Sequence, residues 1–232
     1  MRCFYAETIG EPGTELELNR AEASHLFVTL RGRPGERVAL LDGNGVSAEA
    51  EILAGRRLRV VERELHAPPS LKVHLFCASP RRRELDLILK QAAETGASGV
   101  NLIECERSVA TPDGGAIDRW RGIVIEGCKQ SRNFFAPVLG GPESLSAAVR
   151  RVGASGTRML FGSVAAGGNR PHGLSGEVAL FVGPEGGFTP DEEAFMRENG
   201  VEGWNFSPNV LRLETAAACG VALLKYLAEE RR

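Results

Sequence analysis

The chain has 232 residues, of which 43% are hydrophobic and 25% are charged, and its formal net charge is −2. This length allows one large or two small domains with proper cores, and the charge balance excludes a strongly basic protein that binds nucleic acid through net charge alone. No apolar run approaches the roughly 18 residues that a membrane-spanning helix needs.

The cysteines and histidines follow no metal-binding pattern. The five cysteines are scattered without a C-x-x-C pair, and none of the four histidines stands at a metal-ligand spacing. The sequence therefore predicts no metal site. Because the chain also lacks a recognisable signal peptide, we expect reduced thiols and a cytoplasmic protein.

Short alternating runs separated by glycine-bearing turns fill the first third of the chain. This pattern predicts a small antiparallel barrel or sheet, with strands over residues 14–18, 37–41, 46–53 and 57–61. Residues 20–30 are the one helical candidate in this part. Two prolines at positions 68 and 69 interrupt regular pairing and predict a domain boundary there.

Beyond this boundary the pattern changes to an alternation of strands and helices, which is typical of a mostly parallel sheet. Strands are predicted over residues 71–78, 100–103, 158–162 and 178–182. Helices are predicted over residues 83–95, 117–131, 145–151 and 214–230. The alanine-rich start of the last helix, residues 216–220, is compatible with close packing against other backbone; the alternative is a good helix former with an apolar stripe.

A glycine-rich loop, Gly183 to Phe188, stands between a buried strand and a helix start. Thr189 is the expected N-cap and Pro190 the first helical residue, with Glu192 three residues after the cap. Strand-to-helix turns of this kind bind ligands in open α/β sheets. The helix opens with three carboxylates, which would repel a polyphosphate. A neutral or cationic ligand is therefore favoured, although a tight turn without a ligand is the simpler alternative.

Two motifs together carry a family resemblance: Gly183-Pro184-Glu185-Gly186-Gly187-Phe188 and Leu211-Arg212-Leu213-Glu214-Thr215-Ala216. This pair resembles the signature of the ribosomal RNA small-subunit methyltransferase E family, of the SPOUT class. Further similar blocks are residues 22–26, 30–31, 42–45, 105–108 and 129–131, so that the resemblance covers essentially the whole chain.

The resemblance implies an α/β fold in two domains. Residues 1–68 would form a PUA-like RNA-binding β-barrel, and residues 69–232 a SPOUT-type parallel sheet with a C-terminal trefoil knot around the cofactor site. The implied reaction transfers the methyl group of S-adenosyl-L-methionine to N3 of a uridine in 16S ribosomal RNA. The implied partners are this RNA or the 30S particle and a second copy of the chain, while periodicity by itself indicates neither knot nor dimer.

The resemblance also implies the site residues. The expected cofactor-binding residues are Leu160, Phe161, Gly162, Val182, Gly183, Pro184, Glu185, Gly186, Gly187, Asn209, Val210, Leu211, Leu213, Thr215 and Ala216. The catalytic candidates are Arg212 and Glu214. Arg212 would hold the uridine anion or a phosphate; alternatively, it forms a structural ion pair with Glu214 or a neighbour. No residue is assigned as the acceptor of the N3 proton.

The residues expected to face RNA are His25, Arg31, Arg33, Arg107, Ser108, Gln130, Ser131 and Arg132. Arginine can take phosphate, whereas Gln and Ser can contact a base edge; the alternative is a solvated surface and a polar helix end. The chain departs from the family pattern at several positions. Asn209 stands where many members have arginine, and Arg132 is shifted by one residue. Ser24-His25 replaces the usual pair of histidines, and Glu94-Thr95-Gly96 the usual Glu-Leu-Gly. Methylation of another ribosomal or transfer RNA position, or RNA binding without catalysis, remains an alternative function.

Overall fold

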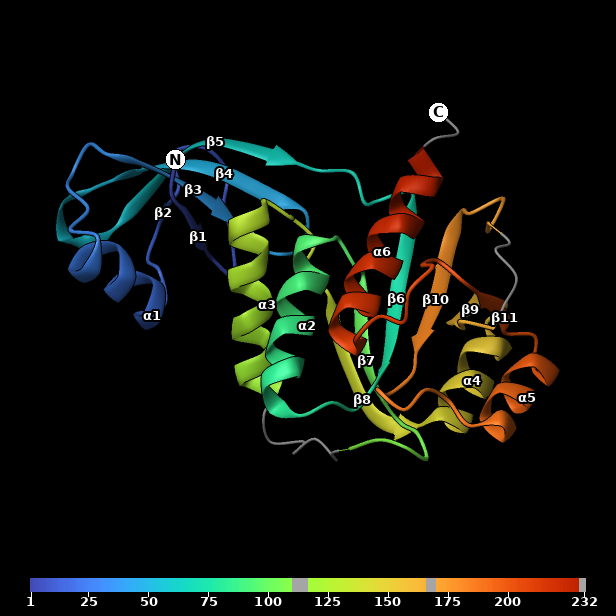
Figure 1. The fold of residues 1–232 in the computed structure, drawn as a ribbon. Helices are drawn as coiled ribbons and strands as arrows, with labels where there is room; N and C mark the ends of the chain where they lie inside the picture. Colours follow the sequence, from blue (N-terminus) through green and yellow to red (C-terminus); the bar gives the residue numbers. More distant parts are fainter. Residues whose placement is uncertain (110–116, 166–169, 230–232) are drawn as a thin grey trace. The chain divides into compact units, whose positions relative to one another are not determined.

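The computed structural model describes residues 1–109, 117–165 and 170–229 (Figure 1). Its contacts divide the chain into two units, one formed by residues 1–68 with 128–136 and the other by residues 69–127 with 137–232. Each unit has a sheet and a core of its own.

The sheet of the N-terminal unit is a curled half-barrel with the strand order β1-β3-β4-β5-β2. The strands are β1 (Cys3–Tyr5), β2 (Glu15–Leu16), β3 (Arg37–Leu41), β4 (Val46–Ile52) and β5 (Leu58–Leu65). Every pair is antiparallel, as predicted, except β1 with β3, which is parallel. Alternate side chains such as Phe4, Leu40 and Ala50 are fully buried and form the core on one face.

The predicted helix over residues 20–30 is split into two pieces. α1 (Arg20–Ala23) begins at Asn19, whose side chain accepts a hydrogen bond from the Glu22 amide at 3.0 Å. A π-helical turn, η1 (Ser24–Thr29), follows, in which the Leu30 amide reaches back to His25 O. A short 3₁₀ turn, η2 (Ala54–Arg56), separates β4 from β5.

Residues 128–136 belong to the N-terminal unit although they lie far along the chain. Lys129 forms an ion pair with Glu22 at 2.7 Å, and both side chains are only 9% exposed. Phe134 stacks on His66 with ring centroids 3.8 Å apart. A charge pair this well buried is costly to break, because either partner alone would be an unpaired buried charge. These contacts therefore fix the segment to the first third of the chain.

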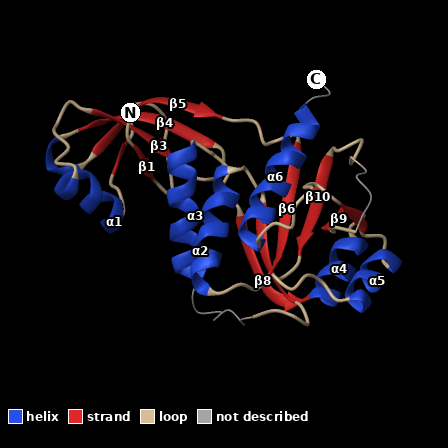
Figure 2. Ribbon diagram, in the orientation of Figure 1, coloured by secondary structure: helices blue, strands red, loops and turns tan. Residues whose placement is uncertain are grey.

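The C-terminal unit contains a six-stranded sheet of order β11-β9-β10-β6-β7-β8 in which every pair is parallel (Figures 1 and 2). The strands are β6 (Leu71–Ala78), β7 (Gly99–Glu104), β8 (Val138–Ser144), β9 (Arg158–Gly162), β10 (Gly176–Val182) and β11 (Glu202–Trp204). The predicted parallel sheet is confirmed. The sequence missed β8 and β11, because both are edge strands and neither forms a buried apolar run.

Helices cover both faces of this sheet. They are α2 (Arg82–Glu94), α3 (Ile117–Ser131), α4 (Leu145–Ala154), α5 (Pro190–Glu198) and α6 (Leu213–Glu229). α6 packs beside α2 and against β6 and β10. Side chains of α4 and α5 join Phe76 and Phe181 in a core on the opposite face, because successive strand residues point to opposite sides. Position 230, the predicted end of the last helix, lies outside the described residues.

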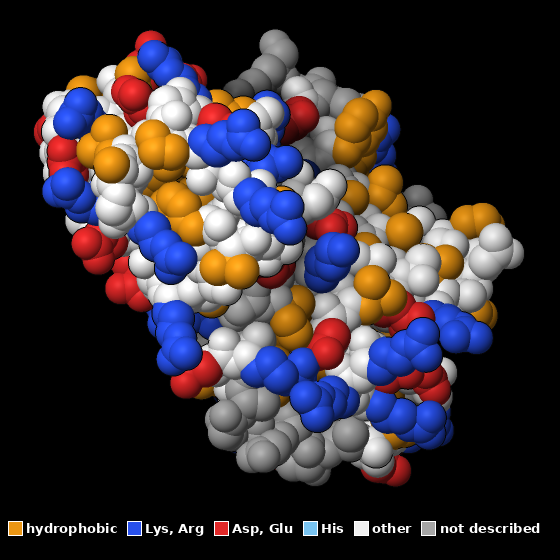
Figure 3. All heavy atoms as spheres, turned by 90° about the vertical axis from the view of Figure 1, so that its left-hand side faces the viewer, with side chains coloured by type: hydrophobic (Ala, Val, Ile, Leu, Met, Phe, Trp, Pro, Cys, Tyr) orange, Lys and Arg blue, Asp and Glu red, His pale blue; other side chains and the backbone are white. Residues whose placement is uncertain are grey.

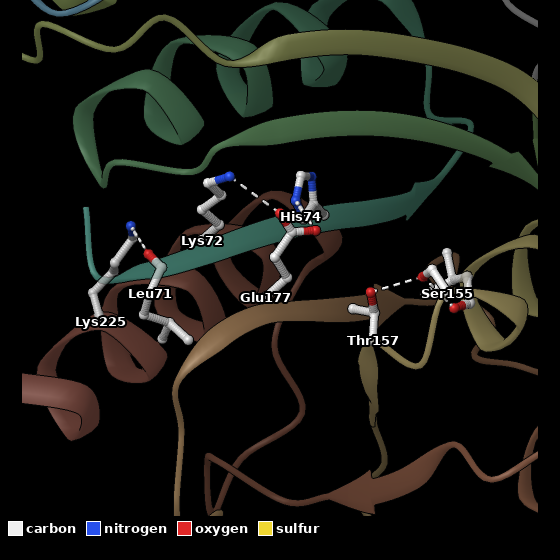
Figure 4. Close-up of polar contacts among 8 residues, drawn as sticks. Leu71, Lys72, His74, Ser155, Thr157, Glu177 and Lys225 are labelled. Atoms are coloured by element: carbon white, nitrogen blue, oxygen red, sulfur yellow. Dashed lines mark hydrogen bonds and ion pairs between the residues drawn. The ribbon is translucent and has the colours of Figure 1, made fainter. Parts of the chain in front are cut away.

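A glycine in α6, Gly220, allows this helix to pack closely on the sheet. A Cβ atom at Gly220 would lie 2.5 Å from Leu180 Cδ2, so this helix position has no room for a side chain. Further along α6, Lys225 joins the helix to β6, because its Nζ donates a hydrogen bond to Leu71 O at 2.6 Å (Figure 4). Burial lowers the pKa of Lys225. None of the described helices is both long and apolar enough to cross a membrane.

Candidate functional site

A cavity of about 300 Å³ lies in the C-terminal unit where β9, β10 and β11 end. Its walls come from the end of β9 and the residues after it (162–165), the end of β10 and its glycine-rich loop (182–185 and 187–188), the end of β11 and the loop after it (204–207 and 209–211), and the starts of α5 and α6. This is the edge of a parallel sheet at which α/β proteins bind ligands, and the volume falls within the range of small-molecule sites.

Most residues of the predicted cofactor set meet at this cavity. Those that line it are Gly162, Val182, Gly183, Pro184, Glu185, Gly187, Asn209, Val210, Leu211, Leu213 and Ala216. The other four do not line it. Leu160 and Phe161 are buried within β9, Thr215 is exposed on α6, and Gly186 faces away from the cavity wall.

Other lining residues were absent from the sequence prediction. They are Ser163, Val164, Ala165, Phe188, Glu193, Trp204, Asn205, Phe206 and Ser207. The loop after β11 is ordered by side chains that cap its own backbone: Asn205 Oδ1 accepts from the Ser207 amide, and Ser207 Oγ from the Asn209 amide, each at 3.1 Å. This Asn-x-Ser-x-Asn spacing is a turn signal that the sequence does contain, but the strand before it was not recognised.

The glycine-rich loop has the local geometry that its residues predict. A Cβ atom at Gly183 would lie 3.0 Å from the Phe188 ring, and Gly187 adopts a positive φ of 70°. The predicted helix start is confirmed as a capping box. The Thr189 side chain accepts from the Glu192 amide at 3.2 Å, and Glu192 Oε2 accepts from the Thr189 amide at 2.8 Å.

The charge of the lining favours a ligand with a positive group. Glu185 and Glu193 are among the described lining residues, which include no lysine or arginine. Glu193 is paired with Arg197 at 3.2 Å, so Glu185 is the lining carboxylate that has no basic partner among the described residues. The side chain of Ser163 adds an unused hydrogen-bonding group. It is 6% exposed, and its Oγ has no hydrogen-bond partner among the described residues. Since buried hydroxyls are normally paired, this one is available to a polar atom of a ligand.

The two catalytic candidates lie at the edge of the cavity. Arg212 is exposed and stands between Leu211 and Leu213, which both line the cavity. Glu214 lines a smaller adjoining hollow together with Glu185 and Glu84. The Oε2 atom of Glu84 is buried and has no hydrogen-bond partner among the described residues. Arg212 and Glu214, both described, form no ion pair with each other, so the structural pairing of these two residues is not seen.

The predicted RNA-facing residues are divided between the two units. His25, Arg31, Arg33, Gln130 and Arg132 are exposed in the N-terminal unit, where Ser131 is half-buried. Arg31 and Arg132 hold left-handed backbone angles with φ of 54° and 57°. Arg107 and Ser108 belong to the C-terminal unit. Figure 3 shows lysine and arginine side chains spread over one face in several groups, between acidic and apolar ones.

The cysteines offer no reactive thiolate within the cores. Burial raises the pKa of Cys77, Cys105 and Cys128 to about 12, and that of Cys3 to about 11. All five cysteines are free. Among the described residues no group of three or more His, Cys, Asp or Glu side chains is placed to hold a metal ion.

Comparison with known proteins shows the family to which this chain belongs. Residues 67–225 match the model of the RNA methyltransferase domain. The chain is 32% identical to ribosomal RNA small subunit methyltransferase E of Mycobacterium bovis, covering 97% of this chain and 91% of the relative. It is 27% identical to the enzyme of that name from Aquifex aeolicus, covering 97% and 99%.

A solved structure agrees with the sequence relatives. The crystal structure of ribosomal RNA small subunit methyltransferase E from Neisseria gonorrhoeae, bound to S-adenosyl methionine, superposes with a TM-score of 0.88 at 26% identity and covers 98% of both chains. The match extends over both units. Together with the identity over nearly the full length, it shows that the chain belongs to the ribosomal RNA small subunit methyltransferase E family.

Proposed function

We propose that this protein is an S-adenosyl-L-methionine-dependent methyltransferase that modifies N3 of a uridine in 16S ribosomal RNA. The observation that carries the proposal is the cavity at the ends of β9, β10 and β11, where both signature loops meet. The names of the relatives supply the RNA class, and the Neisseria gonorrhoeae structure supplies a cofactor bound to a similar fold.

The residues present fit this cofactor. S-adenosyl-L-methionine carries a sulfonium, and Glu185 places negative charge beside the cavity, with no basic side chain among the described lining residues. The buried hydroxyl of Ser163 can bond to a polar atom of the cofactor. Backbone groups of residues 182–187 and 208–213 would hold adenine and ribose. When bound, the cofactor supplies a methyl group already activated as a sulfonium.

The protein must also make N3 of the uridine nucleophilic. N3 of neutral uridine carries a proton and has no free lone pair, so the proton must leave or the anion must be stabilised. Arg212 is exposed at the rim and can donate to a uridine oxygen or to the adjoining phosphate. Glu214, which lines the adjoining hollow, is the second candidate. Bringing the nucleophile and the methyl group together in line lowers the barrier further.

RNA binding is assigned to exposed polar residues of both units. In the N-terminal unit these are His25, Arg31, Arg33, Gln130 and Arg132, joined by the half-buried Ser131; in the C-terminal unit they are Arg107 and the half-buried Ser108. An arginine that contacts phosphate contributes to affinity and carries little sequence information. Substitution of Arg33 should therefore weaken binding to different RNAs about equally and make it less dependent on salt.

A second copy of the chain is the expected partner of α6. Thr215, Cys219, Ala222 and Tyr226 follow one another at helical spacing and are all exposed, so that an uncharged stripe runs along this helix. Such a face favours an interface. Sedimentation equilibrium should show a homodimer, and Ala222→Glu should dissociate it; a monomeric wild-type protein would refute the dimer.

The function is tested by mass spectrometry of nucleosides from small subunits that lack the modification, after incubation with the protein and S-adenosyl-L-methionine. New N3-methyluridine supports the proposal. Methylation at another atom would retain the reaction class and refute the base assignment. Arg212→Ala should lose about two orders of magnitude in turnover, while its cofactor affinity stays near that of the wild type, since Arg212 does not line the cavity.

A further inference from the structure

The turn that follows β7 is fastened to the glycine-rich loop that follows β10. Arg107 Nη1 donates to Gly186 O at 2.7 Å. The neighbouring Glu106 amide donates to Glu192 Oε1 at 2.8 Å. The other oxygen of the same carboxylate, Oε2, accepts a hydrogen bond from the amide of Thr189, the N-cap of α5. The loop is thus held at its middle by a guanidinium and at its end by a shared carboxylate.

The contact with Arg107 lies on the outer side of the loop. Of residues 182–188, all of them described, only Gly186 does not line the cavity. The arginine side chain covers this glycine so closely that a Cβ atom at position 186 would lie 3.2 Å from Arg107 Cδ. Inside the loop, the only backbone bond among the described contacts runs from the Gly187 amide to Pro184 O at 2.8 Å. Arg107 therefore supplies much of what fixes the loop.

We infer that Arg107 is a positioning residue for the cofactor loop, which makes the affinity for S-adenosyl-L-methionine depend on it even when no RNA is present. This inference rests on the proposed function. It adds a second role to a side chain that the family resemblance predicts to face RNA. Hydrogen bonds from charged donors are the stronger ones, and holding a loop in its binding geometry raises affinity by lowering the cost of ordering it.

The guanidinium of Arg107 can also bind an anion. A guanidinium has five N–H donors, and among the described residues Arg107 has no carboxylate partner. An RNA phosphate can therefore bind the same group that holds Gly186. Such an arrangement couples the two ligands through one side chain, and a coupling of this kind acts equally in both directions.

The test measures S-adenosyl-L-methionine binding by isothermal titration calorimetry in the full chain without RNA. Arg107→Ala should raise the dissociation constant roughly tenfold, whereas Arg107→Lys, which keeps a charged donor, should raise it less. Arg121→Ala is the matched control, because it removes an exposed arginine of the same unit that does not line the cavity. It should leave cofactor affinity unchanged. In steady-state assays Arg107→Ala should raise the KM for the cofactor and leave kcat at saturation within about twofold.

The results distinguish a failure of the proposed function from a failure of the role inferred for Arg107. If the wild-type protein does not bind S-adenosyl-L-methionine, the proposed function fails. If the wild type binds and Arg107→Ala binds equally well, with only RNA affinity reduced, Arg107 is an RNA contact alone and the inference is overturned. Should Arg107→Ala fail to fold, Arg107→Lys decides the question by the same two measurements.

Discussion

At the scale of single residues, the cavity contains a hydroxyl that the folded chain itself does not use. Ser163 Oγ is buried and has no hydrogen-bond partner among the described residues. Ser163→Ala should therefore stabilise the ligand-free protein by about 1 kcal/mol, since an unsatisfied buried group is removed. The same change should weaken cofactor binding, because the ligand loses a partner. Urea unfolding and calorimetry measure these two opposite effects.

Ser79 provides the matched control for this prediction. It is equally buried, but its hydroxyl donates to Ile103 O at 3.2 Å. Ser79→Ala should therefore destabilise the protein by about 1 kcal/mol. If both alanine variants lose stability to the same extent, the hydroxyl of Ser163 is satisfied in the ligand-free protein and the prediction is wrong.

A second residue-scale prediction concerns pH. Figure 4 shows Lys72 and His74 of β6 directed towards Glu177 of β10, with His74 Nε2 3.5 Å and Lys72 Nζ 3.2 Å from its carboxylate oxygens. Burial lowers the pKa of His74, although Glu177 opposes this shift. The unfolded chain then binds a proton more readily than the folded one. The contribution of His74 to the free energy of unfolding is fully present above the pKa of histidine in the unfolded chain, about 6.5. It is lost as the pH falls from there through the lower pKa of His74 in the folded protein.

His74→Gln should reduce this acid-side loss. Urea unfolding at several pH values between about 8 and 5 should show a shallower fall in the free energy of unfolding for the variant than for the wild type. His172→Gln, at an exposed histidine, is the control. Equal slopes for the wild type and His74→Gln would contradict the assignment to His74.

At the scale of elements, two helical glycines should respond in opposite ways to the same methyl group. A Cβ atom added at Gly122 on α3 would meet no heavy atom within 4 Å, so Gly122→Ala should stabilise by about 1 kcal/mol through helix propensity. Gly220 on α6 would place Cβ 2.5 Å from Leu180 Cδ2. Gly220→Ala should therefore destabilise by about 1–2 kcal/mol despite the propensity gain. Chemical denaturation tests both, and a stabilised Gly220→Ala would show that α6 shifts freely on the sheet.

The elements themselves were predicted unequally. β6 and β9 were predicted with their observed bounds, because both are buried runs that end at turn residues. β8 and β11 were missed because an edge strand has one partner and needs no continuous apolar sequence. The helix over residues 20–30 was recognised, but its π-helical second part, in which Leu26 is buried in the core, was not.

At the scale of the whole molecule, the cofactor should stabilise one unit only. All described residues that line the cavity belong to the C-terminal unit. Binding to the folded state stabilises by about 2.7 kcal/mol at a hundredfold excess over the dissociation constant. Hydrogen exchange should therefore slow in residues 137–229 upon addition of S-adenosyl-L-methionine and remain unchanged in residues 1–68. Equal protection of both units would show that they unfold as one cooperative body.

The sequence by itself determined the chemistry-bearing loops, because each rests on local rules: a glycine where the backbone needs a positive φ, a Thr–Glu capping box, and a strand that ends before a helix. The tertiary structure alone decided which residues meet. It placed residues 128–136 with a half-barrel about a hundred positions earlier, through the Lys129–Glu22 pair. It also turned Gly186 away from the cavity towards Arg107 and left Ser163 unpaired inside it. These outcomes depend on contacts between distant segments, which no local pattern encodes.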